Sequence, residues 1–507
     1  MNRLLVCLCI VTMTGCTSLK PRPPLPLEAA QPIAADTELD RRIAPLEANR
    51  PDASAFRLVS EGSEAFVLRT GTAMAAERSL DVQTYIWHSD MTGIALADKI
   101  LDAADRGVRV RLLVDDMDAR GKHYGFAALD AHPQIEVRLF NPFQSRAGQL
   151  RFAFEALGDF KRINRRMHNK SWIADNRIAL VGGRNLGDEY FNASEQVNFV
   201  DLDFVMIGPI VRDVSASFDR YWNSEAAYPV HLLAPKDVTP EALASLRQIM
   251  APVVEEARRS RYAQSLRADE DVRKLVAGDI RIEWASTYRF VSDDPLKAAG
   301  KAETASHVVE LLGPMVRAAR ERVNIVSPYF VPGRKGTDGL LELAAAGIEV
   351  NLLTNSLAAN DVAAVYGGYS RWRKPLLEGG VNLWELKPLP GSKTKPSLFG
   401  SSGASLHTKA LSVDGNRVFV GSYNLDPRST SLNTEQGVFV EEPHIAAQLD
   451  ALFQAEIAPP RAWHVTLEEE GLRWSDGKVV HERTPEASFG RKFQAWLARL
   501  LRIDAQL

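Results

Sequence analysis

The sequence predicts an α/β protein with two similar lobes, each built on a βαβ unit with a mixed sheet and flanking helices, packed around one active site. The first observation is a stretch that occurs twice, so that His168 to Asn185 correspond to His407 to Asn424, 239 residues later. The second is a strand–helix–strand pattern that also occurs twice, with Gly107 and Gly347 at equivalent positions. The third is length, because more than 450 residues follow the amino-terminal region, which is long for one hydrophobic core.

Each copy of the repeated stretch predicts a β-hairpin. Apolar, β-branched runs stand on both sides of Asp-Asn in the first copy and of Asp-Gly-Asn in the second, and these residues are typical of tight turns. Residues two apart on a strand point to the same face, so His168 and Lys170 project together, as do His407 and Lys409. An imidazole beside a fixed ammonium suits an anionic phosphate, which the lysine holds while the histidine attacks or moves protons.

Further residues of the two copies are candidates for the same site. Gly183 and Ser422 let the backbone approach a ligand, and Asn185 and Asn424 offer side-chain amides to phosphate oxygens. The aspartate of each copy lies seven residues after the histidine, at the expected hairpin turn. Because aspartate is a preferred turn residue in its own right, a structural role is favoured for both aspartates on spacing alone.

The two copies resemble the phospholipase D superfamily. Its signature, H-x-K-x4-D followed by G-[GS]-x-N, occurs twice, and the second copy continues as DPRSTSLNTE, which adds Asn433 and Glu435. The first copy departs from this continuation, because Gln196 stands where the matching glutamate would fall. Asp201 in the following VDLDFVMIGP is the better match to the acid of this position, and Asp203 is the alternative. The resemblance covers nearly the whole chain after about residue 55.

The resemblance implies a double displacement at phosphorus, with no metal and no cofactor. One histidine attacks a phosphodiester to form a phosphohistidine, while the other protonates the leaving alcohol and then deprotonates the incoming one. By resemblance His168 is the nucleophile and His407 the acid/base, and the reverse assignment stays open. The full set of implied residues is His168, Lys170, Asp175, His407, Lys409 and Asp414 for catalysis, and Asn185, Asn424, Ser422, Gly183, Glu435 and Asp201 for substrate binding. The other histidines show no paired metal-ligand spacing.

The amino terminus predicts an exported lipoprotein. Residues 1–15 have a charged start, an apolar run too short to span a bilayer, and Met13-Thr14-Gly15 before Cys16. This resembles a bacterial lipoprotein signal whose cleavage leaves Cys16 acylated, and an ordinary signal with an incidental cysteine is the alternative. Residues 16–55, rich in Pro and Ala, predict a tether. We therefore expect a chain anchored in the cell envelope and facing the periplasm, with Thr17 resembling the signal for outer-membrane sorting.

Lobe one is expected over residues 56–235 and lobe two over residues 301–460, joined by a charged helical connector at 236–300. Strands at 79–87 and 322–330 are each followed by a helix and a second strand. Because the sites of parallel sheets lie at the carboxyl ends of strands, six residues are candidates for the pocket, although packing is favoured for any one of them: Tyr85, Trp87, Asp115, Asp116, Tyr329 and Asn355.

Two segments each have two interpretations. Residues 145–170 mix aromatic with basic residues, which suits lipid headgroups or nucleic-acid phosphates, or else a solvated basic loop. Residues 461–507 predict a hairpin with Asp476-Gly477 at its turn and an amphipathic terminal helix. The apolar stripe of that helix is flanked by Arg and Lys, which suits a membrane interface; packing against the lobes is equally compatible.

Within the superfamily, segments such as YIWHSDMTG, LLVDDMDARG and SPYFVPG look most like the C-type bacterial cardiolipin synthases. The resemblance implies a phosphatidyltransferase that joins two phospholipids at a membrane surface, with phosphatidylglycerol as acceptor and phosphatidylglycerol or phosphatidylethanolamine as donor. A phospholipase D-type hydrolase, with water as acceptor, is the alternative. A nuclease of the superfamily is disfavoured by the net charge of −3 and the expected anchor, so no nucleic-acid partner is expected. The sequence does not indicate whether an accessory protein is needed.

Overall fold

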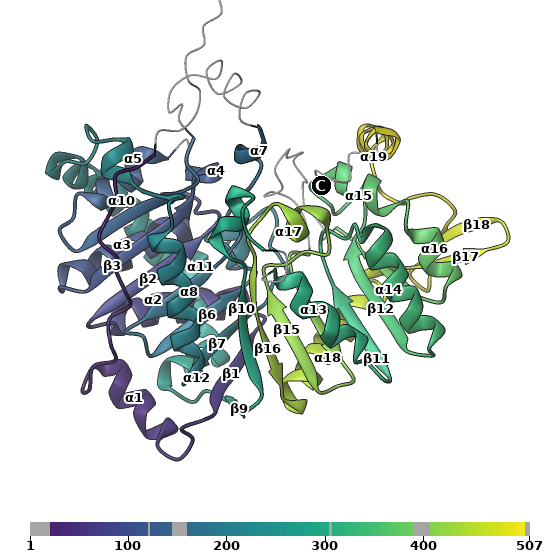
Figure 1. Cartoon of the computed structure of the whole chain (residues 1–507), viewed down its shortest axis with the longest axis horizontal. Coiled ribbons are helices and arrows are strands. Elements are labelled where there is room, and N and C mark those ends of the chain that lie inside the picture. Colours follow the sequence, from purple (N-terminus) through teal and green to yellow (C-terminus); the bar gives the residue numbers. More distant parts are fainter. Residues whose placement is uncertain (1–20, 120–121, 144–159, 304–306, 389–405, 502–507) are drawn as a thin grey trace, which may run out of the picture.

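The computed structural model describes residues 21–119, 122–143, 160–303, 307–388 and 406–501. Two large mixed sheets stand side by side, one in each half of the chain (Figure 1). The expected signal, Cys16 and residues 145–159 of the basic segment lie outside the described residues. Within the described ranges, no helix is both long enough and apolar enough to cross a membrane.

The first sheet has nine strands. Its parallel core is β4–β3–β2, and the strands from β5 onward run antiparallel to their neighbours. The complete order is β8 (Ala227–Pro229), β4 (Ile135–Phe140), β3 (Arg109–Asp115), β2 (Ser79–Thr84), β5 (Ser171–Ala174), β6 (Ile178–Gly182), β7 (Asp203–Ile207), β1 (Ser54–Val59) and β9 (Glu283–Ala285).

The second sheet has ten strands and repeats this topology. The parallel core is now β13–β12–β11, and the hairpin of the second motif pairs beside β11 as the first hairpin pairs beside β2. The complete order is β10 (Tyr288–Ser292), β16 (Gln436–Glu441), β15 (Arg417–Gly421), β14 (Ala410–Val413), β11 (Arg322–Val326), β12 (Glu349–Asn355), β13 (Asn382–Leu386), β17 (Ala462–Glu468), β18 (Gly471–Ser475) and β19 (Val480–His481). The expected fold of two similar lobes with mixed sheets is confirmed.

Helices cover the outer face of each sheet. In lobe one these are α1 (Glu38–Glu47), α2 (Gly62–Ala75), α3 (Met91–Asp105), α5 (His123–Asp130), α10 (Pro240–Arg259), α11 (Arg261–Ala268) and α12 (Glu270–Ala277). In lobe two they are α13 (Val308–Arg317), α14 (Gly333–Ala345), α15 (Ala363–Tyr369) and α16 (Arg373–Glu378), and α19 (Phe489–Leu501) packs on α15. Short helices connect the remaining elements: α4 (Asp116–Ala119), α7 (Phe160–Ile163), η1 (Asp188–Tyr190), α9 (Val230–Leu233), η2 (Pro295–Ala299) and α17 (Pro427–Ser431).

One apolar cluster joins the two lobes. It contains α8 (Ile210–Asn223) and α18 (Pro443–Ile457), which pack between the sheets, together with inward residues of β6, β7, β15 and β16. Phe218 and Trp222 of α8 and Val420 and Val438 of the second sheet are all fully buried. Residues of both lobes bury these large side chains together, and this burial removes apolar surface from water. The two lobes therefore share one continuous hydrophobic core.

The connector differs from its expected form at the carboxyl end. Helices α10 to α12 pack on lobe one, but residues 283–292 then supply one strand to each sheet, β9 to the first and β10 to the second. Lobe two therefore begins before residue 301. The hairpin expected around Asp476 and Gly477 forms between β18 and β19, and β17 joins the same sheet through β13.

Asp175 and Asp414 lie at the hairpin turns, at the end of β5 and β14 opposite to the histidines. Both have positive φ angles. The Asp175 carboxylate accepts hydrogen bonds from the backbone N–H groups of residues 77–79 at 2.8–3.3 Å, and that of Asp414 accepts from residues 320–322 at 2.9–3.1 Å. The implied catalytic role of these two aspartates is therefore wrong: each ties its hairpin to the start of the neighbouring parallel strand, β2 or β11.

This structural role can be tested by stability. Asp175→Ala leaves three backbone N–H groups without their acceptor at a buried turn, so we expect the free energy of unfolding to fall by about 2–4 kcal/mol. Asp414→Ala removes the same contacts at a more exposed turn, where water replaces them, and we expect about 1 kcal/mol. Urea unfolding measures both, and turnover per folded molecule should not change. A variant of normal stability with no turnover would return the aspartates to the catalytic group.

Candidate active site

The two histidines are held at the boundary between the lobes. The two His-x-Lys motifs directly precede β5 and β14, at the ends of these strands that adjoin the carboxyl ends of β2 and β11. The backbone N–H of His168 donates to the carbonyl of Thr434 at 2.9 Å, and that of His407 donates to Val200 at 2.8 Å. Each histidine is thus fixed by the lobe to which it does not belong.

The last residues of β3 and β12 hold the chain just before each histidine. The Asp115 carboxylate accepts from the N–H of Met167 at 2.8 Å and pairs with the buried guanidinium of Arg166 at 2.7 Å. At the equivalent position in lobe two, the side-chain amide of Asn355 bonds both the N–H and the carbonyl of Leu406, at 3.2 and 3.0 Å. Asp115 and Asn355 were candidates for the pocket, with packing favoured for each, and both are positioning residues behind the histidines.

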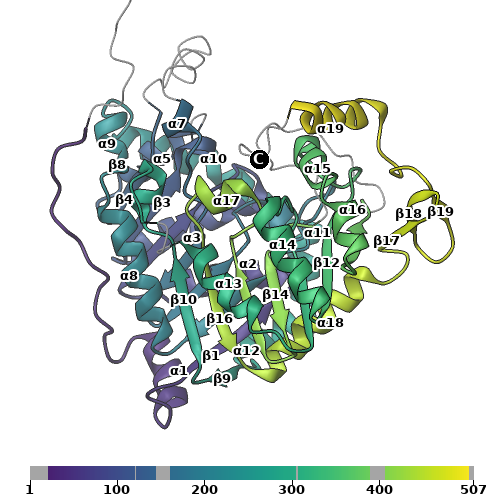
Figure 2. The same cartoon turned by 45° about the vertical axis from the view of Figure 1, so that its right-hand side comes forward.

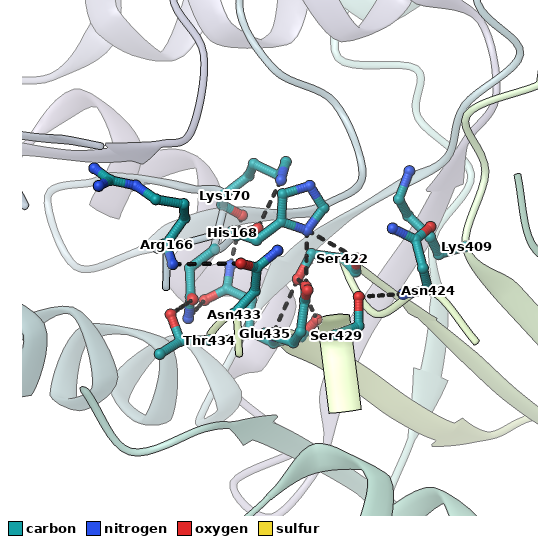
Figure 3. Close-up of polar contacts among 12 residues, drawn as sticks. Arg166, His168, Lys170, Lys409, Ser422, Asn424, Ser429, Asn433, Thr434 and Glu435 are labelled. Carbon is teal, nitrogen blue, oxygen red and sulfur yellow. Dashed lines mark hydrogen bonds and ion pairs between the residues drawn. The ribbon is translucent and has the colours of Figure 1, made fainter. Parts of the chain in front are cut away.

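Each lobe supplies the carboxylate that contacts the histidine of the other lobe. Nδ1 of His168 lies 2.8 Å from a carboxylate oxygen of Glu435 in lobe two, and Nδ1 of His407 lies 2.6 Å from Asp201 in lobe one. Figure 3 shows the first of these contacts, with the other nitrogen of the His168 ring free of drawn contacts. Because each carboxylate engages Nδ1, Nε2 of each imidazole is left for a substrate. Glu435 and Asp201 therefore support the histidines, which corrects their assignment to substrate binding.

The choice between Asp201 and Asp203 is settled by their partners. Asp203 is buried against the guanidinium groups of Arg69 and Arg184, at 3.0 and 3.3 Å, whereas Asp201 alone reaches a histidine. Gln196, at the position of the family's glutamate, is exposed. Asp201, five residues after Gln196, thus contacts His407 as Glu435 contacts His168.

Gly183 and Ser422 occupy matching positions, but the acid beside Gly183 is Asp201 and the acid beside Ser422 is Glu435. A Cβ at Gly183 would lie 2.2 Å from a carboxylate oxygen of Asp201, so glycine is required for that carboxylate to reach His407. At the matching position the Ser422 hydroxyl donates to Glu435 at 2.5 Å, and the Ser422 carbonyl lies 3.1 Å from Nδ1 of His168. Both residues shape the acid–histidine pairs, and a contact of either with substrate stays a prediction.

The two lysines are buried in the same site. Nζ of Lys170 donates to the carbonyl of His168 at 2.6 Å, and Nζ of Lys409 donates to that of His407. Burial lowers the pKa of Lys409 to about 8 and lowers the pKa of Lys170 well below its usual value. Two ammonium groups at the boundary between the lobes form a site for an anion.

Both histidines are neutral at neutral pH. Burial, followed by the charges of Lys170 and Lys409, holds the pKa of His168 well below its usual value. Burial and Lys409 lower the pKa of His407 to about 3. Because the charge of each lysine acts on both rings, the two motifs work as one electrostatic unit. An anionic phosphodiester bound between the lysines would offset their charge and make protonation of a histidine easier.

The two acids are unequal. Burial raises the pKa of Glu435 to about 7, although Lys170 opposes this. Burial also acts to raise the pKa of Asp201, but its contact with His407, together with the charges of Lys409 and Arg184, holds that pKa below its usual value. Asp201 is therefore ionised at neutral pH, whereas Glu435 takes up a proton much more readily than an ordinary glutamate.

Aromatic rings exclude water around both imidazoles. The ring of Tyr85, one of the expected pocket residues, meets the ring of His168 edge-on with centroids 5.1 Å apart. The His407 ring stacks on Phe199 at 5.5 Å and meets Tyr190 edge-on at 5.2 Å. Tyr190 and Phe199 could not be predicted as site residues, because they lie in the irregular stretch after the first hairpin and no sequence pattern marks them.

The remaining candidates divide between the site and the scaffold. Asn185 is used within lobe one, accepting from the N–H of Ile86 and donating to the hydroxyl of Tyr190. The side-chain oxygen of Asn424 is buried and has no hydrogen-bond partner among the described residues, so it is available to a ligand. The others support neighbouring backbone or side chains: Trp87 donates to Gly93, Asp116 accepts from Phe143, and Tyr329 donates to Asp361.

Two charged residues of the second motif's continuation also act on the site. Arg428 of α17 lowers the pKa of His168 and donates to Asn164 of lobe one at 2.6 Å. Burial raises the pKa of Asp426, the N-cap of the same helix, to about 7. Both lie in DPRSTSLNTE, so the sequence contained this signal, but nothing in the pattern distinguishes Arg428 from a solvated arginine.

One group of side chains in the described part of the chain could in principle surround a metal ion. His88, Asp90 and Glu189 lie together, with 3.1 Å between His88 and Glu189. Asp90 also caps α3 and accepts from the N–H of Asp188. These contacts account for the cluster as part of the lobe-one scaffold, and it contains neither histidine of the repeated motif.

Comparison with known proteins agrees with this geometry. The profile of the family described as "Cardiolipin synthase, PLD-like domain" matches residues 72–222 and 312–457, one match in each lobe. Cardiolipin synthase C of Escherichia coli is 41% identical over 91% of this chain and 98% of its own length. A cardiolipin synthase of Staphylococcus aureus is 24% identical over 80% of this chain and 67% of its own.

A solved structure supports the fold. The phosphatidylserine synthase of Haemophilus influenzae superposes with a TM-score of 0.57 at 14% identity, over 92% of this chain and 98% of that one. At this identity the likeness bears on the fold alone, and it spans both lobes. With two family matches, a relative at 41% identity over nearly its full length and a paired His-x-Lys site, the chain belongs to the cardiolipin synthase family of phospholipase D-like proteins.

Proposed function

We propose that this protein is a phosphatidyltransferase that joins two phospholipids into cardiolipin through a phosphohistidine intermediate. The observation that carries the proposal is the pair of buried His-x-Lys motifs, each histidine held at Nδ1 by a carboxylate of the other lobe. Two imidazoles with free Nε2 atoms and two ammonium groups suit double displacement at a phosphodiester. The named relatives are cardiolipin synthases, which makes phospholipids the substrate class.

In the first half of the reaction, Nε2 of His168 attacks phosphorus of the donor lipid. The bond from phosphorus to the headgroup oxygen breaks, and His407 gives its proton to that oxygen, so glycerol or ethanolamine leaves. Lys170 and Lys409 hold the non-bridging oxygens as negative charge develops. Protonated His407 is stabilised by ionised Asp201, whereas Glu435 beside His168 is partly neutral, which favours His168 as nucleophile and His407 as acid.

In the second half, neutral His407 accepts the proton of a hydroxyl of phosphatidylglycerol. That oxygen attacks phosphorus, the N–P bond to His168 breaks, and cardiolipin is released with His168 neutral and His407 protonated again. Water in place of this hydroxyl would give phosphatidic acid, which is the hydrolase alternative. The aromatic rings of Tyr85, Tyr190 and Phe199 around the histidines favour transfer, because they limit access of water.

We also propose that the protein works while anchored to the bacterial envelope from the periplasmic side, in the outer membrane, through acylated Cys16. The support is the sequence alone, a short apolar signal before Met13-Thr14-Gly15-Cys16. The expected tether over residues 16–55 is wrong for its described part, because the chain contacts lobe one from Arg22 onward and includes α1 and the start of β1. Mass spectrometry of the amino-terminal peptide decides the point, since an unmodified cysteine would contradict the anchor.

The reaction is tested by its products. Purified protein with phosphatidylglycerol, alone or with phosphatidylethanolamine, should form cardiolipin and release glycerol or ethanolamine, read by mass spectrometry of isotopically labelled lipids. His168→Ala and His407→Ala should each lower the rate by several orders of magnitude, since both half-reactions need both rings. Phosphatidic acid as the sole product would favour the hydrolase. Cleavage of nucleic acid with no lipid product would overturn the proposal.

The unequal roles of the histidines are tested by trapping the intermediate. A donor with a very good leaving group needs little acid help, so His407→Ala should still become labelled and His168→Ala should not. The label should be acid-labile and base-stable and should map to the peptide that contains His168. A label on the His407 peptide would reverse the assignment. Single turnover without any label would contradict double displacement.

The lysines predict a fall of kcat/KM at alkaline pH. Lys409 must be cationic to bind phosphate, and because burial lowers its pKa to about 8, its charge is lost as the pH rises through that value. The pKa values of the histidines lie well below this range, so protonation of His407 changes smoothly across it and adds no inflection near pH 8. We expect Lys409→Arg to have a lower kcat/KM at neutral pH. Its alkaline fall should be shifted to higher pH, because the guanidinium stays protonated. Lys170→Arg is the matched variant. If neither Lys→Arg variant shifts the alkaline fall of kcat/KM, loss of the lysine charge does not cause that fall.

A further inference from the structure

The carboxy-terminal helix α19 combines a docked face with an exposed apolar face. Ala495 and Ala498 are buried against α15, where a Cβ at Gly367 would lie 2.3 Å from the carbonyl oxygen of Ala495. The aromatic and leucine side chains stay exposed, with Phe489 at 85%, Trp496 at 55% and Leu500 at 61%. This one helix of 13 residues carries six of the sixteen large apolar side chains that are exposed in the described part of the chain.

The two faces are opposite each other. At about 100° per residue, the stripe formed by Phe489, Phe493, Trp496, Leu497, Leu500 and Leu501 points away from the side that carries Arg491, Ala495 and Ala498. Exposed Lys492 and Arg499 lie beside this stripe. The packing on lobe two expected as one alternative for this helix therefore uses the small residues, and leaves an apolar stripe with a basic margin facing outward.

The helix lies on the edge of the molecule that carries the active site. We call this the site edge: it is formed by the carboxyl ends of β2, β3, β11 and β12, which adjoin the two His-x-Lys motifs. Arg491 of α19 donates to the carbonyl of Leu357, two residues beyond β12, at 3.0 Å. Asp361 of the same loop acts electrostatically on both Arg491 and Lys409. Figure 2 shows α19 beside α15 at the top, with α1 and α12 at the opposite edge.

The amino-terminal side of the chain emerges at the same edge. Arg22 donates to the carbonyls of Asn223 and Ser224, next to β8, where Ala227 pairs with Phe140 at the carboxyl end of β4. The chain then descends to the opposite edge, where Gln31 meets Asn176 of the first hairpin turn. Cys16 is six residues before Arg22, within about 20 Å of it at full extension.

We propose that α19 is a membrane-docking helix whose apolar stripe enters the interface of an anionic phospholipid bilayer and turns the site edge toward the lipid. Lys492 and Arg499 match anionic headgroups, and the exit point of the amino terminus lets an anchor and α19 reach one plane. The aromatic rings and leucines suit the boundary between headgroups and acyl chains. The proposal rests on the proposed function only for the identity of the substrate, since docking itself needs no reaction.

A bilayer fits this stripe better than a second copy of the chain. The stripe is one helix wide and has charged residues along its margin, whereas an interface that holds a stable dimer buries a much larger surface, about 800 Å² on each partner. A helix of this kind, lying in the plane of the interface, gives binding strength through its apolar area and its basic margin together.

The first test separates docking from chemistry. We compare Phe489→Gln/Trp496→Gln/Leu500→Gln with a control variant that alters exposed apolar residues at the opposite edge, Leu46→Gln/Met74→Gln/Val276→Gln. Glutamine keeps helix propensity, and none of these side chains is in a core. On vesicles of phosphatidylglycerol and phosphatidylethanolamine we expect the α19 variant to lose about tenfold or more in transfer rate, and on dispersed short-chain lipids to stay within about twofold. The control variant should match the unaltered protein on both.

Equal loss on vesicles and on dispersed lipids, or no loss on vesicles, would overturn docking by α19. If the unaltered full-length protein transfers neither kind of lipid, the proposed function fails, and docking is then judged by fluorescence. The chain has nine tryptophans, so the fluorescence of Trp496 is obtained as the difference between the unaltered protein and the Trp496→Phe variant. We expect acyl-chain-brominated lipids in vesicles to quench this signal. A Trp496 that stays open to aqueous iodide in vesicle-bound protein, or a dimer that the α19 variant dissolves, would overturn the proposal.

Discussion

The exchange of carboxylates between the lobes is the constraint on which the rest of the structure depends. Glu435 can reach His168, and Asp201 can reach His407, only if the two sheets meet in one register. The large apolar cluster between the sheets, with Phe218 and Trp222 fully buried, holds that register. Stability and catalysis therefore share one interface, and a shift between the lobes would disturb both histidines at once.

The two lysines and two histidines buried at this interface prepare the site for an anionic substrate. Without substrate, two buried lysines lie beside two histidines that stay neutral, and the pKa values of all four groups are lowered. An anionic phosphodiester would stabilise this arrangement, because it adds negative charge beside the lysines to that of Glu435 and Asp201. The site is thus organised for the charge of the reacting group before that group arrives, which is the condition for low reorganisation during reaction.

Much of this arrangement could be predicted from the sequence, because it depends on local patterns. The hairpins, the parallel units and the paired His-x-Lys motifs all have clear periodicity and turn residues. For the acid partner of His407 the sequence favoured Asp201 and left Asp203 as the alternative. The choice depends on which aspartate meets Arg69 and Arg184, and that contact is made by the fold. Strand β10 was missed for a similar reason: its five residues lie in a charged connector and pair with β16, far along the chain.

The Gly183–Asp201 and Ser422–Glu435 pairs show how a duplicated protein can become chemically asymmetric. The two halves keep the same strand order, yet one has a glycine with a short ionised acid and the other has a serine with a longer acid that is partly protonated. A side chain at position 183 would clash with Asp201, and removal of the Ser422 hydroxyl would leave Glu435 without that donor. Each acid and the residue beside it are therefore constrained as a pair, so neither can be exchanged between the halves alone.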